Sequence, residues 1–93
     1  MNYMKEKNRF YMEDDNGFEI GEVTFSSAGD SLLIIDHTFV SEAYRGKGIA
    51  AKLVKLVVDK AKKENKKIVP LCAFAKAEFL RKPEYQEVEA GRH

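Results

Sequence analysis

The sequence has very little cysteine and proline, no tryptophan and no long hydrophobic segment. Its single cysteine, Cys72, excludes an intramolecular disulfide and a metal site built on a CxxC pair. No apolar run approaches the roughly 20 residues that span a bilayer, and the N-terminus lacks the apolar segment of a secretory signal. We therefore expect a cytoplasmic protein with no metal centre and no membrane partner.

An excess of charge of one sign is also missing. The chain has 16 Lys or Arg residues and 15 Asp or Glu residues, for a formal net charge of +1. This balance favours neither nucleic acid nor an anionic membrane as a partner. Residues 45–67 are rich in Lys and Arg and predict a basic face. Because no aromatic residues are interleaved there for bases to stack on, nucleic-acid binding is the least favoured function.

The composition is typical of one globular domain. The 93 residues are 44% hydrophobic and 33% charged, which allows one modest core. We expect residues 1–8 and 89–93 to be loose tails. Between them, strands are predicted over Arg9–Glu13, Phe18–Ser26 and Leu32–Val40, the last as a central strand. A bulge near Gly21 would explain why the apolar alternation of the second strand changes parity.

The second half of the chain alternates helix and strand. A strong helical pattern runs from about Gly48 to Asn65. A short strand over Lys67–Cys72 contains Pro70, which cannot donate a ladder hydrogen bond. A short helix from Phe74 to about Arg81 follows. A strand–helix–strand crossover implies one parallel strand pair, so the predicted fold class is α+β, with a mixed, mostly antiparallel sheet, a splayed parallel pair and two helices.

The Gly-rich loop, residues 45–48, separates the longest apolar strand from the strongest helix. A strand, a Gly-rich turn and a helix start together present unpaired backbone N–H groups to an anion. Gly46 and Gly48 allow positive φ, and Arg45 and Lys47 suit phosphate oxygens. The spacing Gly46-x-Gly48-x-x-Ala51 fits a dinucleotide fingerprint only weakly, because the chain is too short for a doubly wound sheet. A Walker P-loop is absent.

The motif Arg45-x-x-Gly48-x-Ala50 at a helix start resembles the acyl-coenzyme-A signature of the GCN5-related N-acetyltransferase family. Other separated motifs match the small branch of that family, of about 90 to 100 residues, in order: His37-Thr38-Phe39-Val40, then Pro70-Leu71-Cys72, Phe79 and Pro83-Glu84-Tyr85. The resemblance covers about Phe18 to Val88 and implies a minimal fold of that family with acetyl-CoA as cofactor.

The resemblance also implies the binding residues. Backbone amides of the loop and helix start would bind the pyrophosphate, and the end of the preceding strand would pair with the pantetheine arm. The expected cofactor-binding residues are Phe39, Val40, Arg45, Gly46, Lys47, Gly48, Ile49 and Ala50. The chain departs from larger family members, whose general-acid tyrosine aligns with Phe79, and it lacks the elements that normally build the acceptor site.

Cys72 and His37 are the candidate catalytic residues. Cys72 is predicted at a strand end just before a helix, where the helix dipole favours a nucleophilic thiolate; the alternative is a small buried hydrophobe. His37 would be a base near neutral pH; the alternative is a structural histidine.

The preferred function is an acetyl-CoA-dependent N-acetyltransferase. Its acceptor is an amine that the sequence does not identify, with a protein or a peptide as one option. The alternative is a non-catalytic or weakly catalytic acyl-CoA-binding module. We expect a monomer or a weak dimer.

Overall fold

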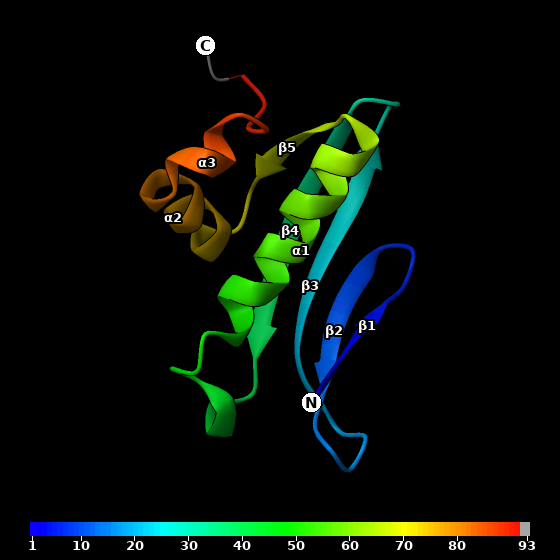
Figure 1. Ribbon diagram of the computed structural model, residues 1–93, viewed down its shortest axis with the longest axis vertical. Helices are drawn as coiled ribbons and strands as arrows, with labels where there is room; N and C mark the ends of the chain where they lie inside the picture. The colour runs from blue at the N-terminus through cyan, green and yellow to red at the C-terminus, as the bar shows by residue number, and fades with distance from the viewer. Residues whose placement is uncertain (92–93) are drawn as a thin grey trace.

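The computed structural model describes residues 1–91, which form one twisted sheet with helices packed beside it (Figure 1). The strands lie in the order β1-β2-β3-β4-β5. Their bounds are β1 Asn2–Lys5, β2 Arg9–Glu13, β3 Glu19–Ala28, β4 Leu32–Val40 and β5 Lys67–Pro70. The helices are η1 Glu42–Tyr44, α1 Ile49–Glu64, α2 Ala73–Arg81 and α3 Pro83–Gln86. The predicted strands and both main helices are therefore present.

The sheet is mixed, as predicted. Strands β1 to β4 pair antiparallel, and β4 pairs with β5 in parallel through the crossover helix α1. Strand β4 has a neighbour on each side, which confirms its central position. Figure 1 shows α1 lying across the sheet, with α2 and α3 together beyond β5.

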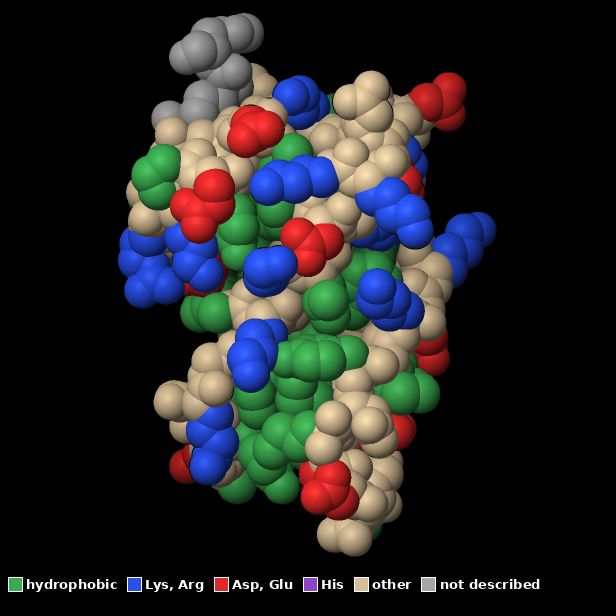
Figure 2. All heavy atoms as spheres, in the orientation of Figure 1, with side chains coloured by type: hydrophobic (Ala, Val, Ile, Leu, Met, Phe, Trp, Pro, Cys, Tyr) green, Lys and Arg blue, Asp and Glu red, His purple; other side chains and the backbone are tan. Residues whose placement is uncertain are grey.

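The core lies between α1 and one face of the sheet. Helix α1 contributes a stripe of fully buried apolar side chains, because its hydrophobic residues recur at the helical period. Strands β2, β3 and β4 contribute alternate residues to the same core: Phe10, Met12, Val23, Phe25, Leu33 and Ile35. The opposite face of these strands, here called the open face, carries polar side chains such as Arg9, Glu22 and Thr24. Figure 2 shows several Lys and Arg side chains on the solvent side of α1.

The prediction of a loose N-terminal tail is wrong for residues 2–5. These residues form β1, which pairs with β2 in register from Asn2 opposite Glu13 to Lys5 opposite Phe10. All four β1 residues are exposed, so backbone hydrogen bonds hold the strand and no apolar alternation marks it in the sequence. At the other end, Ala90 N–H donates to Ile68 O at 2.8 Å, while residues 92–93 lie outside the described part.

Two bulges set the parity of the strands. The β2–β3 register shifts between Met12 and Glu13, so Ile20 is the extra residue, next to the predicted bulge at Gly21. The second bulge was not predicted. The β3–β4 register pairs Thr24 with His37 and Phe25 with Ile35, which leaves Asp36 as an extra residue in β4. Beyond Asp36 the side chains of β4 therefore change faces.

The described helices include none that combines the length and the apolar character needed to cross a membrane.

Candidate active site

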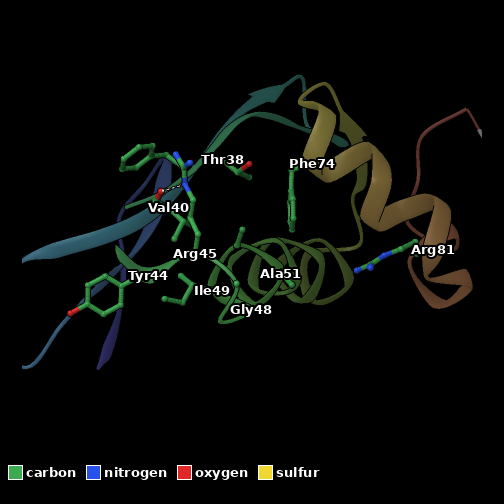
Figure 3. A pocket seen from close by; sticks show the side chains of 12 residues that line it. Thr38, Val40, Tyr44, Arg45, Gly48, Ile49, Ala51, Phe74 and Arg81 are labelled. Carbon is green, nitrogen blue, oxygen red and sulfur yellow. Dashed lines mark hydrogen bonds between the residues drawn. The ribbon is translucent and has the colours of Figure 1, made fainter. Parts of the chain in front are cut away.

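A cleft of about 520 Å³ opens between the end of β4, the start of α1 and helix α2. Its lining joins segments that are distant in the sequence (Figure 3). The lining residues are Thr38, Phe39, Val40, Tyr44, Arg45, Gly46, Gly48, Ile49, Ala50, Ala51, Phe74 and Arg81. The phenyl ring of Phe74 points from α2 toward α1 across this space (Figure 3). The predicted Gly-rich loop thus borders a largely apolar cleft of the size that ligand sites have.

The Gly-rich loop has the backbone geometry that its glycines predict. Gly46 has φ of 80° and Gly48, the N-cap of α1, has φ of 78°, a left-handed conformation that is costly for residues with a Cβ. Apart from the glycine itself and its chain neighbours, no atom of residues 1–91 would lie within 4 Å of a Cβ built on either position. The glycines are therefore required by the backbone conformation, and the space beside them is open.

The amide groups that follow are free to bind an anion. The first helical hydrogen bond is donated by Lys52 to Gly48 O at 3.1 Å, and within residues 1–91 the N–H groups of residues 46–51 have no hydrogen-bond acceptor. Helix α1 has no side-chain N-cap and no acidic residue in its first turn. These six unpaired amides and the positive end of a 16-residue helix create a site that favours negative charge.

Arg45 is fixed at one end of the cleft. Its Nε donates to Val40 O at 3.3 Å, the bond drawn in Figure 3. This bond ties the Gly-rich loop to the end of β4 and leaves the terminal guanidinium nitrogens for another acceptor. Lys47 is exposed on the same loop but does not line the cleft.

The parallel strands separate next to the cleft. Strand β5 pairs only with Leu32–Ile35, and the last bond runs from Leu71 N–H to Ile35 O at 3.0 Å. Residues 36–40 of β4 have no β5 partner. Pro70, the last residue of β5, has no N–H and loses nothing where the strands part. The structure therefore contains the splayed parallel pair that the sequence predicts.

The Asp36 bulge determines which backbone groups of β4 face the gap, the space between the separated ends of β4 and β5. Ser41 N–H donates to Ile20 O at 2.8 Å, so by antiparallel alternation Phe39 and His37 turn their peptide groups to β3. Thr38 and Val40 turn theirs toward the gap. The predicted main-chain contact is thus available from Val40, whereas Phe39 offers its side chain, 49% exposed, at the rim. Thr38 was missed by sequence reasoning, because nothing in the sequence marks Asp36 as a bulge.

Cys72 lies just before α2, as predicted, and is the N-cap of that helix. Its Sγ accepts a hydrogen bond from Ala75 N at 3.4 Å and lies 3.8 Å from Thr38 Oγ1. The side chain is half-buried against the core. Cys72 does not itself line the cleft, but Thr38 does. The thiol is therefore connected to the cleft through one hydroxyl group.

His37 lies apart from Cys72. It is exposed and is the cross-strand neighbour of Thr24 on the open face, whereas Thr38 pairs with the buried Val23 on the core face. Cross-strand neighbours share a face, so the two candidate catalytic side chains lie on opposite sides of the sheet beside the same gap. No hydrogen bond joins them in the described residues. Phe79, which the sequence analysis aligned with a general-acid tyrosine, is buried against Tyr85 with ring centroids 5.4 Å apart.

Comparison with protein families gives one match. A family model described as GCN5-related N-acetyl-transferase matches residues 9–88. A comparison with curated proteins found no match.

Solved structures share the fold. The solution structure of a GCN5-like protein from Staphylococcus aureus, assigned as an N-acetyltransferase, has 35% identity, covers 99% of this chain and 90% of its own, and has a TM-score of 0.80. An Escherichia coli N-acetyltransferase of the GNAT family in complex with CoA has 29% identity over 68% of this chain and 38% of its own, with a TM-score of 0.61. A ribosomal-protein-alanine N-acetyltransferase from Brucella melitensis has 25% identity over 78% of this chain and 60% of its own, with a TM-score of 0.64.

Proposed function

The chain belongs to the GCN5-related N-acetyltransferase family, and on that premise we propose that it transfers the acetyl group of acetyl-CoA to an amine. One observation carries the proposal. The unpaired amides at the start of α1 open into the same cleft as the unpaired end of β4. The amides suit the pyrophosphate, and the strand end suits the extended, amide-containing pantetheine arm. The E. coli relative with 29% identity was crystallised with CoA, which supports the same ligand here.

The residues of the cleft fit this ligand. N–H groups of residues 46–51 and the guanidinium of Arg45 would bind the pyrophosphate, with Lys47 adding positive charge beside it. Gap-facing peptide groups of Thr38 and Val40 would pair with the pantetheine amides. Phe39 and Phe74 would cover its apolar segments. The cleft therefore offers donors where the ligand is anionic and apolar surface where it is not.

Acetyl-CoA would supply the acetyl group as a thioester, so that one N–C bond forms, one C–S bond breaks, the amine loses a proton and the CoA sulfur gains one. A backbone N–H donor where the two strands separate would polarise the thioester carbonyl. His37 would take the proton from an amine that approaches through the open face. Cys72, on the other side of the gap, would protonate the leaving sulfur or accept the acetyl group transiently.

The test separates binding from transfer. Titration calorimetry with acetyl-CoA and a turnover assay over a panel of amines and peptides are run on the wild type, Arg45→Gln and Lys62→Gln. Lys62 is exposed at the far end of α1 and serves as the matched control for loss of one positive charge. We expect Arg45→Gln to weaken binding and Lys62→Gln to leave it unchanged. A wild type that binds no acetyl-CoA would contradict the proposal.

A non-catalytic acyl-CoA-binding module is the second candidate. Two observations favour it. On the open face of the sheet, no helix of residues 1–91 covers His37. In addition, the part that matches this chain makes up only 38% of the E. coli chain and 60% of the Brucella chain. Tight binding of acetyl-CoA without turnover on any amine of the panel would favour this candidate. Turnover that is lost in His37→Gln would exclude it.

A further inference from the structure

The cleft is bordered by a second cation that the proposed function has not used. Among the cleft-lining residues that the structure describes, only Arg45 and Arg81 are charged. Arg45 belongs to the Gly-rich loop, whereas Arg81 is the last residue of α2. In Figure 3 the guanidinium of Arg81 extends from α2 toward α1 and lies well apart from Arg45 and Gly48. The cleft therefore has positive charge at two separate places.

A buried carboxylate holds Arg81 in this position. Glu78, one helical turn earlier, is 1% exposed and forms an ion pair with Arg81 Nη2. A carboxylate is rarely so deeply buried unless it is paired. The Arg81 side chain is 67% exposed. An arginine has five N–H donors, so the contact with Glu78 leaves several donors for a ligand.

Arg81 is not required to neutralise Glu78. The ammonium group of Lys82 lies 3.1 Å from the other carboxylate oxygen, Oε1. Hydrogen bonding to Glu78 raises the pKa of Lys82 above its usual value, so Lys82 is fully charged at neutral pH. One negative and two positive charges leave a net positive charge, and the more exposed of the two cations is the one that lines the cleft.

We propose that Arg81 binds the 3′-phosphate of acetyl-CoA and that Glu78 is its positioning residue. The inference rests on the proposed function. CoA carries phosphate at two places, a pyrophosphate and a 3′-phosphomonoester, and the free amides of residues 46–51 account for the first. A phosphomonoester near neutral pH has close to two negative charges and three acceptor oxygens. These match the planar fork of an arginine, which binds phosphate through paired hydrogen bonds.

The experiment compares two ligands that differ only in this phosphate. Titration calorimetry with CoA and with 3′-dephospho-CoA is carried out on the wild type, Arg81→Gln and Lys76→Gln. Lys76 is an exposed cation on the same helix that does not line the cleft. We expect Arg81→Gln to weaken CoA binding by about tenfold, the effect of losing a charge-assisted hydrogen bond. Its affinity for 3′-dephospho-CoA should equal that of the wild type, and Lys76→Gln should bind both ligands as the wild type does.

The positioning role of Glu78 has its own readout. Glu78→Gln keeps the side-chain volume but removes the charge that orients Arg81, so we expect it to reduce the preference for CoA over 3′-dephospho-CoA. It should add nothing in the Arg81→Gln background, because the two residues act through one contact. A purely structural role would instead lower the melting temperature and weaken both ligands equally.

The outcomes distinguish this inference from the proposed function. Wild-type protein that binds neither ligand would overturn the proposed function. Wild-type binding that Arg81→Gln leaves unchanged would overturn the 3′-phosphate assignment alone. An equal loss for both ligands in Arg81→Gln would also overturn it, since Arg81 would then contact the pyrophosphate or support the fold.

Discussion

Replacing Gly48 by alanine tests the Gly-rich loop, because the structure predicts two separate effects for it. The first is conformational. Gly48 has φ of 78°, and a residue with a Cβ costs about 1–2 kcal/mol in the left-handed region. For a domain of this size, each kcal/mol lowers the melting temperature by about 4–8 °C. Beyond its chain neighbours, no atom of the described residues lies within 4 Å of the added Cβ, so no clash with them adds to this cost.

The second effect of Gly48→Ala is on ligand binding. Gly48 lines the cleft, so the added methyl group takes space beside the amides that would bind phosphate. Loss of one charge-assisted hydrogen bond costs about 1.5 kcal/mol or more, and we therefore expect CoA affinity to fall at least about tenfold.

Gly17→Ala is the matched control. Gly17 has φ of 84° and equally open surroundings, but it lies in the β2–β3 hairpin turn and does not line the cleft. Thermal unfolding should therefore show similar destabilisation for both variants, and calorimetry should show weakened CoA binding only for Gly48→Ala. If both variants bind CoA like the wild type, the Gly-rich loop does not form the phosphate site.

Three further predictions concern catalysis and packing. Cys72→Ala should lose about 1 kcal/mol of stability, because it removes the N-cap of α2. Intact-mass spectrometry after incubation with acetyl-CoA tests the chemical role of the thiol: an acetyl adduct on the wild type alone supports the covalent route. Full turnover by the variant would remove the thiol from the mechanism. His37→Gln should lower kcat by about a hundredfold or more with unchanged acetyl-CoA affinity; equal kcat would contradict its role as base. Gly21→Ala should destabilise the fold by about 1–3 kcal/mol, because its Cβ would lie 3.1 Å from Ile49 Cγ2 and 3.2 Å from Phe39 O; a melting temperature equal to the wild type would refute this.

The sequence predicted the parts of the fold that local patterns determine. Helix α1 combines a regular apolar stripe with residues in the left-handed conformation at both ends, Gly48 and Asn65, and its bounds were predicted closely. The Gly-rich loop and the strand separation at Pro70 followed from residue types with few conformational options. Strand β1 was missed because all of its side chains are exposed.

The missed parts of the candidate site depend on longer-range geometry. The bulge at Asp36 changes which β4 side chains face the core, and it brings Thr38 rather than His37 next to Cys72. No residue type in that stretch identifies the bulge. Arg81 reaches the cleft only because α2 packs beside α1 and Glu78 holds its side chain. A single sequence contains neither of these tertiary relationships in a readable form.

The central claim is that the free amides at the start of α1 bind the phosphates of CoA. Two-dimensional ¹H–¹⁵N NMR spectra of the 93-residue protein, recorded during titration with CoA, test it directly. We predict that the largest amide shifts occur at residues 46–51, the N–H groups that have no acceptor among residues 1–91. Saturable binding that leaves these amides unshifted would contradict the account, as would no binding at all.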